Sequence, residues 1–164
     1  MIGLMRKVLS TCFGIGYIPG PGGTYGSLLT VILLYLFIDK TAAWFVGESV
    51  AVFLLFYLIF VFVSFWLCND TVRNFGKDDP KSVCIDEVAG QLITFLFVPL
   101  SGGTLLAGFV IFRFFDIVKP YPIHLFEELE DGVGIVSDDV VAGLMSCVLL
   151  NLLVVIYGII VARI

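Results

Sequence analysis

The chain has 164 residues, of which 60% are hydrophobic and 14% charged, and its net charge is −5. Soluble domains are usually about 45–50% apolar and about a quarter charged, so this composition excludes an ordinary soluble domain and indicates an integral membrane protein. All fourteen acids except Asp39 and Glu48 lie between Asp70 and Asp139. Since no basic face is evident, nucleic acid is not expected as a partner.

The segment from Cys12 to Ser27 is rich in Gly and Pro, which predicts an irregular connection. Its spacing fits neither a dinucleotide fingerprint nor a phosphate-binding loop of nucleotide enzymes. Two interpretations stay open. In the first, its backbone N–H groups and the hydroxyls of Thr24 and Ser27 bind a phosphate. In the second, the segment is only a tight connection at the membrane surface.

The apolar runs that follow predict an all-α fold, a polytopic membrane helical bundle with about four to five membrane helices. These runs are Ser27 to Ile38, Ser49 to Cys68, Val83 to Val98, Thr104 to Ile117, and Val140 to Val161. The third and fourth are short, so the stretch from Val83 to Ile117 is either a re-entrant hairpin or two spans with polar ends at headgroup depth. No linker or repeat is evident, and residues 1–164 are expected to form a single membrane-embedded domain.

Basic residues gather on one side of this predicted topology. They precede the first run, follow the second, and follow the returning pair: Arg6, Lys7, Arg73, Lys77, Lys81 and Lys119. Because Lys and Arg are enriched in cytoplasmic loops, this side is predicted to face the cytoplasm. The Gly-rich segment and most of the acids lie on the same side.

Three acidic positions stand at the cytoplasmic edges of apolar runs: Asp86-Glu87, Asp116 and Asp138-Asp139. Carboxylates beside hydrocarbon cost free energy unless something cationic compensates them. Oxygen ligands in this number suit a hard divalent cation such as Mg²⁺, which can neutralise a phosphoryl group and activate a water. The pattern therefore indicates a metal site that acts on a phosphate.

Each acidic position also has a simpler explanation. Both acid pairs stand where helices are expected to begin, and acids there stabilise a helix by about 0.3–1 kcal/mol each, with Ser137 as a candidate cap. Arg113, Asp116 and Lys119 are spaced three apart and could form only a surface ion-pair ladder. The metal-site interpretation is preferred because the charge count places all three positions on one side.

Two other polar features are interpreted as surface residues. His124 is the single histidine and follows Pro122 in an expected irregular loop. The acids Glu127, Glu128, Glu130 and Asp131 form a charge run, which is typical of a solvated face.

Four motifs occur in this order: Gly23-Thr24-Tyr25-Gly26-Ser27, Ile85-Asp86-Glu87-x-x-Gly90, Arg113-x-x-Asp116-x-x-Lys119-Pro120-x-Pro122-Ile123, and Gly134-Ile135-x-x-Asp138-Asp139-x-x-Ala142-Gly143. Together, over nearly the whole chain, they resemble the phosphatidylglycerophosphatase A family. The resemblance implies Mg²⁺-dependent hydrolysis of the terminal phosphomonoester of phosphatidylglycerol phosphate to phosphatidylglycerol and phosphate. It also implies a place in phospholipid biosynthesis, in the bacterial inner membrane.

The resemblance implies a role for each motif residue. The expected catalytic acids are Asp86, Glu87, Asp116, Asp138 and Asp139. Asp86, Glu87, Asp138 and Asp139 are expected to hold one or two Mg²⁺. The expected substrate-binding residues are Thr24, Arg113 and Lys119, together with Ser27 of the Gly-rich segment. Direct attack by water and an aspartyl-phosphate intermediate both stay open.

A small ion or divalent-metal transport protein is the alternative, since intramembrane acids also mark ion pathways. That function predicts acids in the middle of a span. The runs from Ser49 to Cys68 and from Val140 to Val161 contain none, which argues against a pore.

Overall fold

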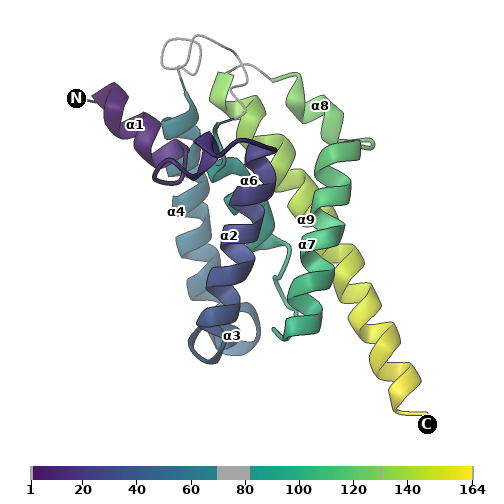
Figure 1. The fold of residues 1–164 in the computed structure, drawn as a ribbon. Helices are drawn as coiled ribbons and strands as arrows, with labels where there is room; N and C mark the ends of the chain where they lie inside the picture. Colours follow the sequence, from purple (N-terminus) through teal and green to yellow (C-terminus); the bar gives the residue numbers. More distant parts are fainter. Residues whose placement is uncertain (1, 70–81, 130, 164) are drawn as a thin grey trace.

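The computed structural model describes residues 2–69, 82–129 and 131–163, and every regular element in these ranges is a helix (Figure 1). The elements are α1 (Ile2–Ser10), η1 (Ile15–Tyr17), α2 (Gly22–Leu36), α3 (Ile38–Phe45), η2 (Gly47–Ser49), α4 (Val50–Cys68), α6 (Ile85–Ile93), α7 (Gly102–Val118), α8 (Ile123–Glu127) and α9 (Asp131–Val161). The predicted all-α class is confirmed. Arg73, Lys77 and Lys81, which entered the charge count, lie outside the described residues.

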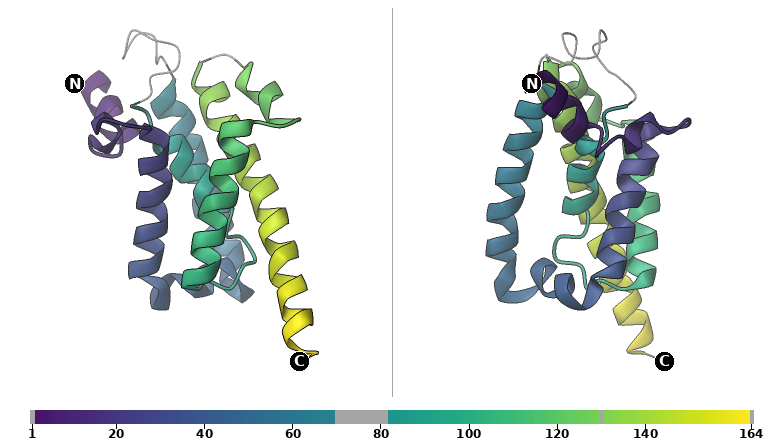
Figure 2. Two further views of the ribbon diagram at one scale, coloured as in Figure 1. Left: turned by 45° about the vertical axis from the view of Figure 1, so that its right-hand side comes forward. Right: turned by 60° about the vertical axis from the view of Figure 1, so that its left-hand side comes forward.

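Helices α2, α4, α7 and α9 run alongside one another between two ends of the molecule (Figures 1 and 2). The short helix α6 contacts all four of them. One end, called the α1 end below, carries α1, α8 and the N-termini of α2, α6 and α9. The opposite end, called the α3 end, carries α3 and the C-terminus. Elements distant in sequence therefore begin close together at the α1 end.

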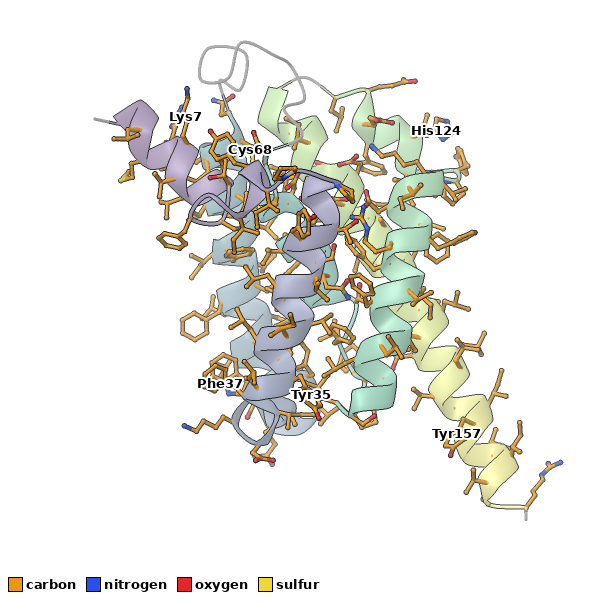
Figure 3. All side chains as sticks on the ribbon, in the orientation of Figure 1. Lys7, Tyr35, Phe37, Cys68, His124 and Tyr157 are labelled. Carbon is orange, nitrogen blue, oxygen red and sulfur yellow. The ribbon has the colours of Figure 1, made fainter. Side chains whose placement is uncertain are left out.

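The predicted number of membrane-spanning helices is close to the number in the described structure. Helices α4 and α9 are long and apolar enough to cross a membrane, and α2 with α3, bent by 106°, makes a third if the pair is one broken span. The count of two or three is slightly below the expected four to five, because α7 has 17 residues and covers only about 26 Å. Exposed aromatic residues toward the α3 end, labelled in Figure 3, suit a membrane interface: Tyr35, Phe37 and Tyr157.

Helix α2 begins earlier than the sequence predicts. Gly22 to Ser27 were expected to be irregular, but they form the first turns of α2 after Pro21. Glycine lowers helix stability by about 1 kcal/mol relative to alanine, so packing must compensate. At Gly26 a Cβ would lie 2.6 Å from the Cys84 carbonyl oxygen, which shows that α2 approaches α6 too closely for any other residue.

Helix α9 also begins earlier than expected. The helix was predicted to open at Ser137-Asp138-Asp139, but it starts at Asp131. Its first turn packs against the end of α4, since a Cβ on Gly132 would lie 2.4 Å from the Cys68 carbonyl carbon. The two acids therefore lie two turns inside α9, and helix capping by Ser137 or the acid pair is excluded there.

The stretch from Val83 to Ile117 extends between both ends of the bundle instead of turning back midway (Figure 2). The predicted helix to Val98 is wrong beyond Ile93, where an irregular segment continues to the α3 end. There the Phe97 N–H donates to the Phe45 carbonyl of α3 at 2.8 Å. Irregular backbone at membrane depth requires burial within protein, and Phe95 and Val98 are fully buried.

Asn151 of α9 donates a hydrogen bond to the backbone of this irregular segment. Its Nδ2 donates to the carbonyl oxygens of Leu96 and Cys147, both at 2.9 Å. The Cys147 thiol also contacts the Leu96 oxygen, at 3.2 Å. Asn151, in the last span, thus supplies a hydrogen-bond donor to the Leu96 carbonyl, which lies outside any helix.

Replacing Asn151 with Leu is expected to destabilise the protein by about 1–2 kcal/mol, because the Leu96 carbonyl loses its amide donor. The measurement is the thermal midpoint of detergent-solubilised protein. Leu152→Val at the exposed neighbouring position is the control and should leave the midpoint unchanged. Equal midpoints for Asn151→Leu and the control would contradict the assigned role.

Candidate functional site

Three acids from two helices converge at the α1 end. Asp86 and Glu87 lie in the first turn of α6, and Asp139 lies in α9. Their carboxylate oxygens lie within 4.8 Å of one another. Asp86 and Asp139 are nearly buried, with 7% and 4% of their surface exposed. We call these three residues the acid cluster.

Two glycines allow α6 and α9 to bring the acids together. A Cβ on Gly90 would lie 2.4 Å from the Asp139 carbonyl oxygen, and a Cβ on Gly143 would lie 2.2 Å from the Gly90 carbonyl oxygen. The two backbones are therefore in direct contact beside Asp139. Small residues at helix contacts are the usual means of such close approach in membrane bundles.

The first turn of α2 closes the cluster on another side. At Gly23 a Cβ would lie 1.9 Å from Oε1 of Glu87 and 3.1 Å from Nη1 of Arg113. The Gly-rich motif therefore lies against both an acid and a base of the predicted site. A side chain at this position would displace the Glu87 carboxylate from its place in the acid cluster.

The acid cluster fits a divalent cation by its chemistry. Oδ1 of Asp86 and Oε2 of Glu87 are buried and have no hydrogen-bond partner among the described residues. Mg²⁺ binds oxygens at about 2.0–2.1 Å, so ligands on opposite sides of it lie about 4 Å apart, close to the spread seen here. Buried, unpaired carboxylates in contact with one another are unfavourable without a cation.

Arg113 and Asp116 form an ion pair next to the cluster. Nη1 of Arg113 lies 2.5 Å from Oδ2 of Asp116, and both side chains are mostly buried, at 14% and 13% exposure. The charge of Asp116 also repels Asp86, Glu87 and Asp139. The alternative interpretation, a surface ion-pair ladder on α7, is therefore wrong for Arg113 and Asp116, which border the acid cluster.

Lys119 binds two acids at the end of α7. It adopts a left-handed backbone conformation at the C-cap, before Pro120, and its Nζ donates to Asp138 at 2.7 Å and to Glu127 at 2.6 Å. Burial lowers the pKa of Lys119, but the two carboxylates outweigh burial and raise it above the ordinary value. Lys119 is therefore a permanent cation linking α7, α8 and α9.

The structure separates the two neighbouring acids of α9. Asp138 accepts from Lys119 through Oδ2 and from the Asp139 N–H through Oδ1, whereas Asp139 joins the acid cluster. The expected role of Asp138 as a metal ligand remains a prediction. Its observed partner is a lysine.

The two hydroxyl residues of the Gly-rich segment lie in different environments. Thr24 is partly exposed in the first turn of α2, one residue from Gly23. Ser27 is fully buried, and its hydroxyl donates to the Gly23 carbonyl of its own helix at 3.0 Å. Substrate binding by either residue remains a prediction, and only Thr24 is accessible in this structure.

Sequence reasoning missed several contacts near the site. Glu127 was interpreted as part of a solvated run, but it holds Lys119. Tyr57 of α4 donates to the Ala89 carbonyl of α6 at 3.2 Å.

Gln91 is fully buried in α6. The only sequence signal for Gln91 is a polar residue within an apolar run. His124, by contrast, is exposed on α8 beside Tyr121, as expected for a surface histidine (Figure 3).

The fold and these contacts define a helical membrane protein with a buried, oxygen-rich acid cluster at one end of its bundle. Residues 8–154 match the family model described as Phosphatidylglycerophosphatase A, and the chain belongs to that family. The predicted membership is confirmed, and with it the predicted enzyme class, a phosphatase.

Curated relatives cover most of the chain. The phosphatidylglycerophosphatase A of Haemophilus influenzae is 37% identical over 143 residues, which cover 86% of this chain and 83% of the relative. The enzyme of that name from Escherichia coli K12 is 34% identical over 141 residues, 85% of this chain and 77% of the relative. A putative phosphatidylinositol-3-phosphatase of Bacteroides thetaiotaomicron is 35% identical over 149 residues, 87% and 89% of the two chains. No solved structure matches the chain.

Gly23→Ala is expected to lower phosphatase activity by roughly tenfold or more, because the new methyl group displaces the Glu87 carboxylate. The measurement is phosphate release by purified protein in detergent. Gly102→Ala is the matched control, since its Cβ meets only Tyr35 at an ordinary 3.7 Å. Wild-type activity in Gly23→Ala would show that the contact between α2 and Glu87 has no role in catalysis.

Proposed function

We propose that this protein hydrolyses the terminal phosphomonoester of phosphatidylglycerol phosphate to phosphatidylglycerol and phosphate, with Mg²⁺ as cofactor. The observation that carries the proposal is the convergence of three carboxylates from α6 and α9, those of buried Asp86 and Asp139 and half-buried Glu87, at one end of a membrane bundle. Membership of the family and the names of two relatives support this substrate.

Asp86, Glu87 and Asp139 would hold the cation. When bound, Mg²⁺ neutralises charge on the phosphoryl group and lowers the pKa of a coordinated water. The carboxylates supply the negative charge and the oxygen donors for this site. Close contact of α2 with Glu87 shields that acid from solvent and keeps it near Asp86 and Asp139.

Arg113 and Lys119 would bind the phosphate. The planar guanidinium of Arg113 can contact two phosphate oxygens at once, and Lys119 adds a compact positive charge. Asp116 holds Arg113 in place and lies close to the acid cluster. We propose that its carboxylate acts as a metal ligand, as the base or as the nucleophile of the reaction.

We infer that the site faces the cytoplasm in a bacterial inner membrane. Arg6 and Lys7 of α1 and Lys119 at the end of α7 lie at the α1 end, whereas Lys40 of α3 and Arg163 near the C-terminus lie at the α3 end (Figure 1). This distribution agrees with the sequence-based charge count. A site at one end of the bundle would meet a lipid headgroup without drawing it into the hydrocarbon core.

The distribution of acids favours a hydrolase over the alternative, an ion or metal transport protein. Asp138 and Asp139 do lie inside the helix of the last span, contrary to expectation. Beyond Asp139, however, α9 has no acid as far as Val161, and α4 has none. A path of acids across the bundle, which transport would require, is thus missing from these two helices.

Phosphate release from three lipids tests the proposed substrate. Phosphatidylglycerol phosphate, phosphatidate and phosphatidylinositol 3-phosphate are presented in the same detergent micelles with Mg²⁺. We expect kcat/KM to be at least tenfold higher for phosphatidylglycerol phosphate than for either competitor. A preference for phosphatidylinositol 3-phosphate would instead assign this chain the activity for which the Bacteroides relative is named.

A further inference from the structure

Gln91 is a buried polar residue outside the acid cluster whose side-chain amide is unpaired at both polar atoms in the described structure. Its side chain is fully buried, and neither Nε2 nor Oε1 has a hydrogen-bond partner among the described residues. Two fully buried hydroxyls nearby are satisfied: Thr94, the C-cap of α6, donates to the Gly90 carbonyl at 2.9 Å, and Ser146 of α9 donates to the Ala142 carbonyl at 2.7 Å. An unpaired buried amide destabilises the folded protein, so a leucine at this position would favour folding more.

Gln91 lies one helical turn from Glu87, a member of the acid cluster. It follows Glu87 by four residues on α6, so the two side chains share one face of the helix, about 5–6 Å apart at Cβ. Helical side chains lean toward the N-terminus of their helix, which carries the amide of Gln91 toward the turn of Glu87. Oε2 of Glu87 is itself buried and unpartnered.

The two bases of α7 near the acid cluster form ion pairs with acids other than Glu87. Arg113 pairs with Asp116, and Lys119 pairs with Asp138 and Glu127. None of these bases therefore compensates Glu87 as a direct ion-pair partner in the described structure. The amide of Gln91 is a further donor within one helical turn of Glu87, and it adds no charge to a cluster that already holds three acids.

We propose that Gln91 is a positioning residue of the metal centre. With the cation bound, its amide N–H would donate to the Glu87 carboxylate, whose Oε2 is unpartnered in this structure, and would fix the orientation of that ligand. Its carbonyl oxygen would accept from a water at the site. Hydrogen bonds to ligating carboxylates commonly contribute 10- to 100-fold in metal affinity. The inference rests on the proposed function, since it requires a divalent cation at the acid cluster.

Gln91→Leu and the near-isosteric Gln91→Met separate this role from a merely structural one. Mn²⁺ affinity is measured by calorimetry on the full chain in detergent, and the thermal midpoint is measured in EDTA. We expect both variants to bind Mn²⁺ roughly 10- to 100-fold more weakly. Their midpoints in EDTA should equal or exceed that of the wild type, because an unpaired amide has been removed.

Thr94→Val is the matched control, since it removes another fully buried polar group at the C-cap of α6 and should leave Mn²⁺ affinity unchanged. Wild-type affinity in both Gln91 variants would overturn this inference alone. Failure of the wild-type protein to bind Mn²⁺ would overturn both this inference and the metal dependence proposed above. The two failures are therefore distinguishable.

Discussion

Asp139→Asn is expected to reduce phosphate release by roughly 100- to 1,000-fold while the protein remains folded in the membrane. The cation that Asp139 would hold contributes several kcal/mol to catalysis, and each 1.4 kcal/mol corresponds to about tenfold in rate. Asp139 is nearly buried and lies within 4.8 Å of Asp86 and Glu87. The variant should therefore lose the metal without losing its fold.

Asp39→Asn is the matched control for this substitution. Asp39 is an exposed acid in the first turn of α3, at the opposite end of the bundle. The same chemical change there should leave activity within about twofold of the wild type, since an exposed acid at a helix N-terminus contributes only about 0.3–1 kcal/mol to stability. Near wild-type activity in Asp139→Asn would remove that residue from the active site.

Chelation is expected to have an equally large effect. EDTA should abolish phosphate release, and excess Mg²⁺ should restore it. Because the acid cluster crowds three carboxylates together, Mg²⁺ should also raise the thermal midpoint of the wild type, by roughly 5–10 °C at a hundredfold excess over Kd. Phosphate release and thermal unfolding, with and without EDTA, measure the two effects separately.

The same chelation experiment on Asp139→Asn shows which acids are responsible. Its midpoint in EDTA should be no lower than that of the wild type, because one of three repelling charges has been removed. Added Mg²⁺ should not raise it. Full activity of the wild type in EDTA would contradict a metal-dependent mechanism, and an equal Mg²⁺ response in the variant would place the cation elsewhere.

The long apolar elements were predictable from sequence because their signals are local. The run from Ser49 to Cys68 has no charge or breaker, and α4 matches it almost to the residue. The end of α7 was also predictable, since Pro120 cannot continue a helix. In both cases the residues that determine the element lie within it or next to it.

The elements that were missed depend on contacts distant in sequence. Nothing between Ile93 and Val98 is a helix breaker, yet the helix ends there, because Asn151 and Phe45 supply partners for the freed backbone. Helix α2 includes Gly23 and Gly26 because α6 and α7 pack against them. Such contacts cannot be inferred from local propensity.

The same distinction applies to the candidate site. The acids and bases were identifiable by type and by side of the membrane, but their partners were not. Asp138 and Asp139 are equivalent in the sequence pattern, and only the packing of α9 turns one toward Lys119 and the other toward Asp86. The role of Gln91 also emerges only from its complete burial.

Anomalous diffraction from crystals soaked with Mn²⁺ tests the central claim most directly, because it locates the cation independently of activity. We predict a single strong peak bound by the carboxylates of Asp86, Glu87 and Asp139, and no such peak in crystals of Asp139→Asn. A peak held by other residues, with these three carboxylates still unbound, would contradict the metal centre described here.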